Sequence, residues 1–376
     1  MADRAVPESR KDSWVMDAVF VALFAAVLCS GAGAAAMGFN RVGLDEKRAL
    51  TASPTWPSTL TEWAALPHAF DQYVNDHFGL RNELIALNSY SRYRLGVSAS
   101  PKVLVGNRGW LFYISDVNWE FFRGKNRLSD AELRQWLDRM EKHRNWLAER
   151  GIQFLILAAP VKESIYPEYL PYWLRREKAE TQLDQIVRGA ATRPGLTVID
   201  VRKQLLERKR ETAVYQAFDT HWNDEGGFIA YTAIMQEIAR RRPEIARLTR
   251  QSFELVPARR RQIQQDLAQM LGIDLFVQPE CPVYIPRHLS TIDIKYLTSK
   301  TDENSPQLIT TGIPNTPKII LIRDSFSAAV LPYMEDTFGW LLVRHHQDGS
   351  FPQADIEKYR PDIVLLEARE AGLDAM

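Results

Sequence analysis

The chain has 376 residues, of which 45% are hydrophobic and 25% are charged, a composition typical of a folded protein with one large domain or two small ones. Its 47 Lys and Arg residues balance 47 Asp and Glu residues, which argues against a dedicated nucleic-acid binder, because such proteins usually carry a basic excess. Two cysteines are too few for a disulfide scaffold or a cysteine-based zinc motif.

The first feature along the chain is an uncharged, mostly apolar stretch from Ala18 to Phe39. As a helix that rises about 1.5 Å per residue, it would reach about 33 Å, which is enough to cross a bilayer. We therefore predict an N-terminal tail at 1–17 and a transmembrane signal anchor at 18–39. A cleavable signal peptide is the alternative, because Ala34-Ala35-Ala36 offers small residues at which a signal peptidase could cut.

A tether and a helical lead-in are predicted for 40–101. The part from 40 to about 67 is rich in Thr, Ser, Pro and Trp, which is typical of a linker. The part from 68 to 95 carries apolar residues at three- and four-residue spacings, which indicates a helix. A catalytic domain is expected from 102 to 376, and the apolar runs that flank Gly106-Asn-Arg-Gly109 predict a strand, a tight turn and a second strand.

Segments that suit strands and helices alternate through this domain. Helical patterns occupy 129–150, 177–190, 224–241 and 325–335. Apolar runs that suit strands buried on both faces occupy 154–159, 197–201, 318–322, 340–343 and 362–366. This alternation predicts an α/β fold, a parallel sheet with helices on both faces, and a functional site at the carboxyl ends of the strands. The segment from about 245 to 315 interrupts the alternation, and we expect a helix followed by an irregular excursion there.

Two short segments carry residue types suited to nucleophilic catalysis. Asp219-Thr-His-Trp222 lies on a loop that enters the predicted helix from 224, and Arg323-Asp-Ser-Phe326 directly follows a buried strand. A serine hydroxyl becomes a nucleophile when a neighbouring histidine takes its proton, and a third group then orients that histidine. Asp219, His221 and Ser325 supply these three types.

These segments resemble those of the alginate O-acetyltransferase family, bacterial polysaccharide acetylation proteins with an SGNH-hydrolase-like domain. The likeness covers roughly residues 68–376, and in this family the Asp-His pair precedes the serine, as it does here. Further matching segments are Asp76–Arg81, Gly106–Tyr113, Pro160–Lys162, Tyr166–Pro171 and Asp266–Leu271. The resemblance implies that Ser325 is the acetyl-carrying nucleophile, His221 the general base and Asp219 the partner that orients it.

The resemblance also implies where the protein works and with what. It implies a single-pass protein of the bacterial inner membrane, with a cytoplasmic tail and the catalytic domain in the periplasm. An exported polysaccharide would be the acceptor, and a multi-pass membrane O-acyltransferase would present the acetyl donor. No metal, nucleotide cofactor or nucleic-acid partner is expected.

Four further residues are candidates for the site. The position before the Asp-Ser pair is Arg323, where classical SGNH enzymes have glycine. We therefore expect the backbone amides of Ser325 and Phe326 to stabilise an oxyanion, with the Arg323 guanidinium as an additional cation. Trp222 is expected to be a packed aromatic residue rather than a platform for sugar. Lys162 follows a predicted strand and either faces the site or is solvated.

Other interpretations stay open at this level. Ser325 could cap a helix that follows a strand, and Asp219 could cap the helix that begins near 223. The adjacent His345 and His346 are expected on opposite faces of a strand end, which argues against a shared metal site. Two rival functions remain: an acetylesterase that uses the same three residues, and a non-catalytic scaffold that binds glycan.

Overall fold

The computed structural model describes residues 9–37, 49–114, 120, 123–125, 127–174, 180–257, 265–278, 281–288, 291–302, 304–348 and 351–375. The chain forms two compact units, Met1–Arg92 and Tyr93–Met376, and each is described by itself below. The units divide about ten residues before the domain start that the sequence analysis placed at 102.

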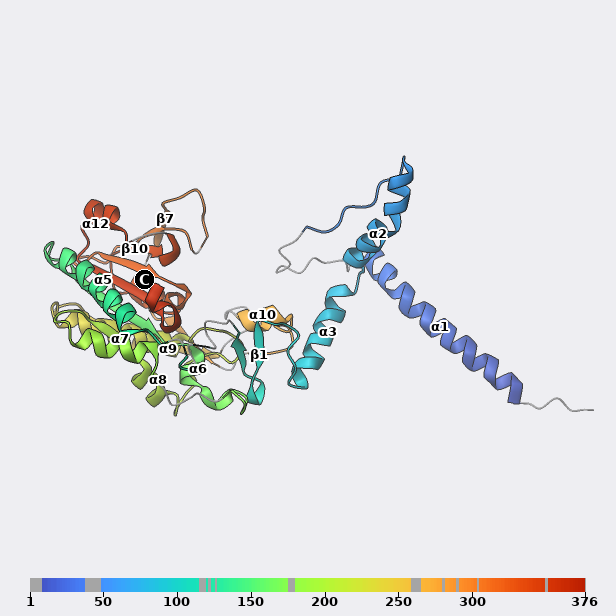
Figure 1. The fold of residues 1–376 in the computed structure, drawn as a ribbon, viewed down its shortest axis with the longest axis horizontal. Coiled ribbons are helices and arrows are strands. Elements are labelled where there is room, and N and C mark those ends of the chain that lie inside the picture. The colour runs from blue at the N-terminus through green and yellow to red at the C-terminus, as the bar shows by residue number, and fades with distance from the viewer. Residues whose placement is uncertain are drawn as a thin grey trace, which may run out of the picture. The chain divides into compact units, whose positions relative to one another are not determined.

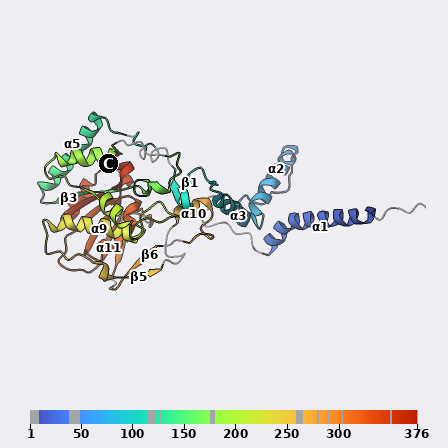
Figure 2. The same ribbon diagram turned by 90° about the horizontal axis from the view of Figure 1, so that it is seen from below.

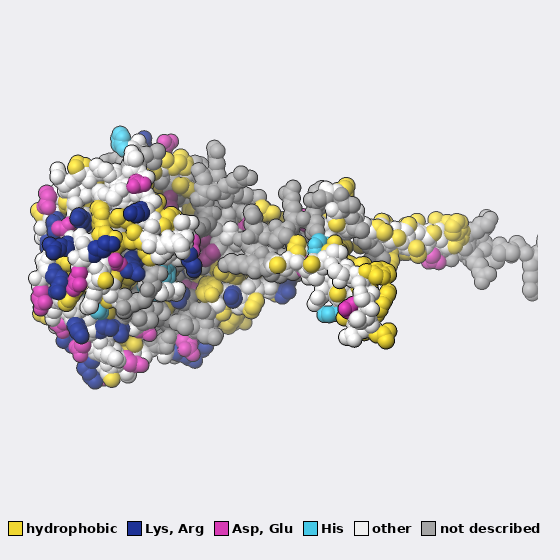
Figure 3. Space-filling view, turned by 90° about the horizontal axis from the view of Figure 1, so that it is seen from above, with side chains coloured by type: hydrophobic (Ala, Val, Ile, Leu, Met, Phe, Trp, Pro, Cys, Tyr) yellow, Lys and Arg dark blue, Asp and Glu magenta, His cyan; other side chains and the backbone are white. Residues whose placement is uncertain are grey.

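The first unit contains the candidate membrane span. Helix α1 (Ser9–Ala36) includes the window Trp14–Ala35, whose mean hydropathy of 2.2 and length of 22 residues suffice, by length and composition, to cross a membrane. Figure 3 shows hydrophobic side chains along this helix, and Phe20 and Phe24 are about two-thirds exposed to solvent. Such exposure of large apolar side chains is what lipid would cover.

Two helices follow in the first unit, where the sequence pattern indicated one. Helix α2 (Leu60–His77) begins at a capping box, in which the Thr59 hydroxyl accepts the Glu62 N–H and the Glu62 carboxylate accepts the Thr59 N–H. Helix α3 (Arg81–Arg94) is separate, because the chain becomes extended at Phe78. The three- and four-residue apolar spacing is interrupted at this break, between Phe78 and Leu84.

The second unit holds the sheets and the remaining helices. Its strands are β1 (Val103–Val105), β2 (Leu111–Tyr113), β3 (Gln153–Ala159), β4 (Val198–Asp200), β5 (Phe253–Pro257), β6 (Pro282–Pro286), β7 (Asp293–Tyr296), β8 (Gln307–Thr310), β9 (Ile319–Arg323), β10 (Trp340–His345) and β11 (Ile363–Arg369). Its α-helices are α5 (Asp130–Ala148), α6 (Lys162–Ile165), α7 (Gln182–Ala191), α8 (Arg202–Arg208), α9 (Asp224–Ala239), α10 (Asp266–Leu271), α11 (Leu331–Glu335) and α12 (Gln353–Tyr359). Its 3₁₀ turns are η1 (Asn107–Gly109), η2 (Pro167–Tyr169), η3 (Arg250–Ser252), η4 (Ser325–Ala329), η5 (His346–Asp348) and η6 (Glu370–Ala375).

The main sheet of this unit has the strand order β4-β3-β11-β9-β10-β8-β7. Figure 1 labels two of its strands, β10 and β7. The first five strands in that order pair in parallel, which confirms the five strands predicted from apolar runs. Strands β8 and β7 pair antiparallel, so the sheet is mixed and not purely parallel as expected. Both come from the 245–315 segment that was expected to be irregular. Strand β7 is largely exposed and lacks the apolar run that marks a central strand.

Helices cover both faces of the main sheet, and Figure 2 shows α5 and α9 on opposite sides of β3. Alternate residues of β3 serve the two faces. Leu155 and Leu157 pack in the cluster that contains the apolar side of α9, whereas Phe154 and Ile156 pack in the cluster with α5 and α7. Burying one such side chain stabilises the fold by about 1.5–3 kcal/mol, so these two layers hold the strand ends in place.

The predicted strand, turn and strand near the start of the domain is also observed. Strands β1 and β2 pair antiparallel, with Val103 opposite Tyr113. The turn between them passes through Arg108 and Gly109, whose φ angles of 56° and 78° are left-handed. A glycine meets that requirement without steric cost. A second antiparallel pair, β5 with β6, lies within the 245–315 segment.

Candidate active site

A pocket of about 550 Å³ lies at the carboxyl ends of β9, β10 and β11, the edge where the sequence analysis placed a functional site. Its lining includes Ser325 and His221, together with Tyr113 from β2 and Asp266 from α10. The volume falls within the range of about 300–1000 Å³ that is usual for small-molecule sites. The pocket therefore has room for a small-molecule ligand.

Ser325 stands immediately after β9, at the start of η4, and its side chain is exposed. Asp324, and not Ser325, caps the turn: Asp324 Oδ1 accepts the N–H of Phe326 at 2.8 Å. The second carboxylate oxygen of Asp324 accepts the N–H of Arg369, at the end of β11, at 2.7 Å. The Ser325 hydroxyl is thus not used as a helix cap and is presented to the pocket.

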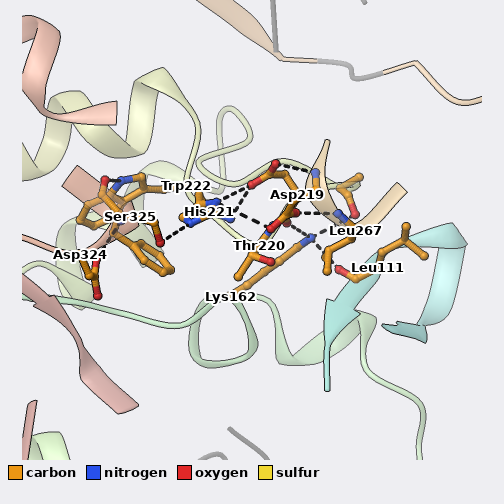
Figure 4. Close-up of polar contacts among 12 residues, drawn as sticks. Leu111, Lys162, Asp219, Thr220, His221, Trp222, Leu267, Asp324 and Ser325 are labelled. Carbon is orange, nitrogen blue, oxygen red and sulfur yellow. Dashed lines mark hydrogen bonds and ion pairs between the residues drawn. The ribbon is translucent and has the colours of Figure 1, made fainter. Parts of the chain in front are cut away.

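The structure brings the three predicted residues together in one hydrogen-bond chain (Figure 4). The Ser325 Oγ lies 2.8 Å from His221 Nε2, and His221 Nδ1 lies 2.7 Å from Asp219 Oδ1. The same Asp219 oxygen accepts the backbone N–H of His221 at 2.9 Å, so the loop bends back on itself in an Asx turn. Asn223, not Asp219, caps α9, which excludes the capping interpretation of Asp219.

The charges along the hydrogen-bond chain from Ser325 to Asp219 favour an ionised Asp219 and a basic His221. Burial raises the pKa of Asp219, but its hydrogen bond from His221, the His221 charge and nearby N–H groups bring the pKa below its usual value. Burial lowers the pKa of His221, but the hydrogen bond to Asp219 and the charges of Asp219 and Asp266 raise it above its usual value. An imidazolium formed on His221 would be stabilised by the same carboxylates.

Asp266, at the start of α10, is a second carboxyl group at this histidine. Its Oδ2 lies 4.0 Å from His221 Nδ1, and its Oδ1 accepts the Thr220 N–H at 2.8 Å. Its own N–H donates to Asp219 Oδ2 at 3.0 Å. The sequence analysis noted Asp266 only as part of a matching segment, because nothing in the residue pattern connects it to a loop more than forty positions away.

The three-residue group Asp219, His221 and Asp266 also has ligand atoms within 4.8 Å of one another, the spacing of a metal site. Nδ1 of His221 is already engaged by Asp219, however, and a metal ion there would have to break that hydrogen bond. The arrangement is therefore better suited to orienting the imidazole than to binding a cation.

Lys162 is neither solvated nor part of the pocket lining, the two alternatives that the sequence analysis left. It is 2% exposed, and its ammonium group donates to the carbonyl oxygens of Leu111 at 2.7 Å, Ala217 at 3.0 Å and Asp219 at 2.9 Å (Figure 4). Burial lowers the pKa of Lys162 to about 7, although nearby carboxylates oppose the shift. Lys162 thus ties the Asp219 loop to β2.

Trp222 is a packed aromatic residue, as expected. It is 1% exposed, and its indole N–H donates to the Phe326 carbonyl at 2.8 Å, which joins the histidine loop to the serine turn. The Phe326 amide, expected at an oxyanion site, instead donates to Asp324 Oδ1. This leaves the Ser325 N–H as the candidate oxyanion donor. Phe326 itself contributes to the pocket lining.

Arg323 does not take the place expected for it. It is 5% exposed, its Nη1 donates to the carbonyl of Asp324 at 3.1 Å, and it is not part of the pocket lining. Arg369 lines the pocket instead. As the last residue of β9, Arg323 belongs to a strand that is buried on both faces, which directs its side chain into the protein.

The adjacent histidines were expected on opposite faces of a strand end, and the structure corrects this. Their rings stack with centroids 4.7 Å apart, and both residues line the pocket. The reason is local: β10 ends at His345 and η5 begins at His346, so the alternation of a strand does not extend to the second residue.

Several known proteins resemble this chain in sequence or in fold. Residues 103–361 match the family described as the SGNH hydrolase-like domain of acetyltransferase AlgX. A probable alginate O-acetylase AlgJ from Pseudomonas fluorescens is 22% identical over 310 residues, which cover 79% of this chain and 75% of that protein. Bacillus cereus PatB1 with a sulfonyl adduct has a similar fold, with a TM-score of 0.52 and 14% identity over 72% of this chain and 97% of that one. A DHHW family protein from Eubacterium siraeum gives a TM-score of 0.51 at 14% identity, covering 72% and 91% of the two chains.

Proposed function

We propose a function on the premise that the chain belongs to the SGNH hydrolase-like acetyltransferase family of AlgX. The protein is an O-acetyltransferase that carries acetyl on Ser325 and transfers it to hydroxyl groups of an exported polysaccharide. The observation that carries the proposal is the hydrogen-bond chain from Ser325 through His221 to Asp219, which opens into a pocket.

In the first half of the reaction Ser325 takes the acetyl group. Its Oγ attacks the acetyl carbonyl carbon while its proton passes to His221 Nε2, 2.8 Å away. The bond from the acetyl carbon to the donor then breaks, and the imidazolium returns the proton to the leaving atom. Asp219 holds the Nδ1 proton throughout and stabilises the imidazolium, which requires that the carboxylate stay ionised.

In the second half a sugar hydroxyl resolves the ester. His221 removes the hydroxyl proton, the sugar oxygen attacks the acetyl carbon, and Ser325 Oγ leaves and regains the proton. Each tetrahedral intermediate carries a negative oxygen, and we expect the Ser325 N–H, at the start of η4, to donate to it. No redox or metal step is needed for the proton and electron-pair balance of this scheme.

The surroundings of the enzyme form part of the same proposal. The apolar helix α1 fits a single-pass anchor, which would hold the catalytic unit on the periplasmic side of a bacterial inner membrane. There the protein would meet an exported polysaccharide and a multi-pass membrane O-acyltransferase that presents the acetyl donor. The relatives named alginate O-acetylase support a polysaccharide acceptor.

The test uses the full-length chain in detergent with an activated acetyl ester as donor. Reactions with and without deacetylated alginate oligosaccharides are analysed by mass spectrometry for acetylated sugar and by acetate release. We expect acetylated sugar from the wild type and at least a roughly thousand-fold lower rate from Ser325→Ala. Undiminished activity of the variant would exclude the mechanism. If added sugar does not reduce the release of acetate, the rival acetylesterase function is favoured. If the protein binds sugar but shows no turnover, the scaffold function is favoured.

A further inference from the structure

The turn that presents Ser325 rests on a buried carboxyl group that the mechanism above does not use. Glu367, on β11, is fully buried, and its Oε2 accepts the Asp324 N–H at 3.0 Å and the Ser327 hydroxyl at 2.6 Å. These two residues lie directly before Ser325 and two positions after it. We propose that Glu367 is a positioning residue that fixes the Ser325 turn from both sides, and this inference rests on the proposed role of Ser325 as the nucleophile.

The bonds to Glu367 extend the pairing of β9 with β11 beyond the end of their ladder. The parallel ladder ends at Ile322 and Leu366. The next residues of β11 then hold the turn by other means: Glu367 through its side chain, and Arg369 through its backbone N–H, which donates to Asp324 Oδ2 at 2.7 Å. The serine turn is therefore fixed to a central strand, in addition to its bond to Trp222 of the histidine loop.

Glu367 performs this role as a neutral acid. Burial and the neighbouring Asp324 carboxylate raise the pKa of Glu367 well above its ordinary value. Oε1 is buried with no hydrogen-bond partner among the described residues, so the charge of an ionised group would stand uncompensated beside a second carboxylate. A neutral carboxyl group keeps the accepting oxygen that the turn requires.

Catalysis should respond strongly to this positioning. The Ser325 Oγ and His221 Nε2 are 2.8 Å apart, and a displacement of about 1 Å can reduce a catalytic rate about a hundred-fold. Loss of Glu367 removes its bonds to the Asp324 N–H and the Ser327 hydroxyl and leaves the Arg369 bond in place, whereas a glutamine keeps a carbonyl oxygen that can accept both. The effect should fall on kcat and not on KM, because the residue is not part of the pocket lining.

The experiment compares Glu367→Ala and Glu367→Gln in the full-length protein in detergent. Two quantities are measured per folded molecule: kcat and KM for 4-nitrophenyl acetate, and the rate at which phenylmethylsulfonyl fluoride labels Ser325. We expect Glu367→Ala to lower kcat and the labelling rate about a hundred-fold with little change in KM, and Glu367→Gln to stay within about five-fold of wild type. Ser327→Ala, which removes one of the two bonds, should fall between them.

Gln153→Ala serves as the matched control, because Gln153 is a buried polar residue at the opposite end of the neighbouring strand β3. It should lose stability and keep kcat. Equal kcat and labelling in wild type and Glu367→Ala, or a glutamine variant as impaired as the alanine variant, would overturn the role of Glu367 alone. Wild-type protein that is not labelled at Ser325 would overturn the proposed function and this inference together.

Thermal unfolding supplies a second readout, which a simple packing role would not change. Because the folded state holds the Glu367 proton more tightly than the unfolded state does, the wild type should lose stability as the pH rises above 4.5, the ordinary pKa of a glutamic acid. Glu367→Gln has no such proton, so its melting temperature should fall less over that range. Identical pH dependence in the two proteins would exclude a neutral Glu367.

Discussion

Replacement of Asp266 by asparagine tests the electrostatics of the site directly. The asparagine side chain keeps an oxygen that can accept the Thr220 N–H, and the backbone N–H that holds Asp219 Oδ2 is unaffected. The variant therefore removes one negative charge near His221 and leaves the hydrogen bonds of the loop in place. The pKa of His221 should fall, since the Asp266 charge is one of the causes that raise it.

The size of the effect follows from the geometry. Two unit charges 4.0 Å apart interact by about 4 kcal/mol at an effective dielectric constant of about 20, and by about 1 kcal/mol in water. The Asp266 side chain is 28% exposed, which favours the lower part of that range. An interaction of about 1–2 kcal/mol corresponds to a shift of about 1 pH unit. Burial and the Asp219 charge raise the pKa of Asp266 itself, so Asp266 loses part of its charge on acidification. The pKa of His221 should therefore shift by no more than about 1 pH unit.

The assay is the pH dependence of kcat/KM for an acetyl ester, whose acid limb reports the ionisation of His221 in the free enzyme. We expect the acid limb of Asp266→Asn to lie about 1 pH unit lower than that of wild type, with a smaller maximum because the imidazolium is less stabilised. Glu149→Gln, which removes a 74% exposed charge at the C-cap of α5, is the control and should leave the limb in place. An unmoved limb in an Asp266→Asn variant that is folded and active would refute the electrostatic role of Asp266.

Three further changes test how the site is held. Lys162→Met should lower kcat at least about ten-fold and reduce the melting temperature, because three buried carbonyl oxygens, including that of Asp219, lose their donor at about 1–3 kcal/mol each. Kinetics and calorimetry measure the two effects, and a fully active variant would contradict the role of Lys162 in holding the Asp219 loop. Trp222→Phe removes the hydrogen bond to the Phe326 carbonyl and should lower the free energy of unfolding in urea titrations by about 0.5–1.5 kcal/mol. A changed m-value, or no loss of stability, would argue against this bond between the histidine loop and the serine turn. Leu321→Ala, in the core of β9, should lower the free energy of unfolding by about 2–5 kcal/mol and leave kcat per folded molecule unchanged. A selective loss of activity would show that the packing of β9 also affects the geometry of the site.

Much of the fold could be predicted because its central strands carry a local signature. The runs at 154–159 and 318–322 are continuously apolar since both faces of those strands are buried, and such runs stand out in any sequence. Strands β7 and β8 have no such signature. Their pairing with β10 depends on contacts between segments that are distant in the chain, and short exposed strands resemble loops when only one segment is considered.

The site divides in the same way. Asp219, His221 and Ser325 could be chosen in advance because catalysis demands those residue types on loops beside a strand end. The supporting residues could not, because Lys162 and Glu367 act through distances between backbone and side-chain atoms that no spacing in the sequence records. Arg323 was misplaced for a related reason, since its position beside the serine said nothing about the direction of its side chain.

The sequence by itself determined the α/β class, the apolar anchor candidate and the three residue types of the hydrogen-bond chain, because hydrophobic burial and nucleophilic chemistry both impose choices at single positions. Tertiary structure alone decided that Asp266 also meets His221, where Lys162 donates its protons and what holds the serine turn. These contacts join residues separated by forty positions or more, and their strength depends on burial and on distances of a few ångströms. Such quantities exist only after the strands have been placed side by side.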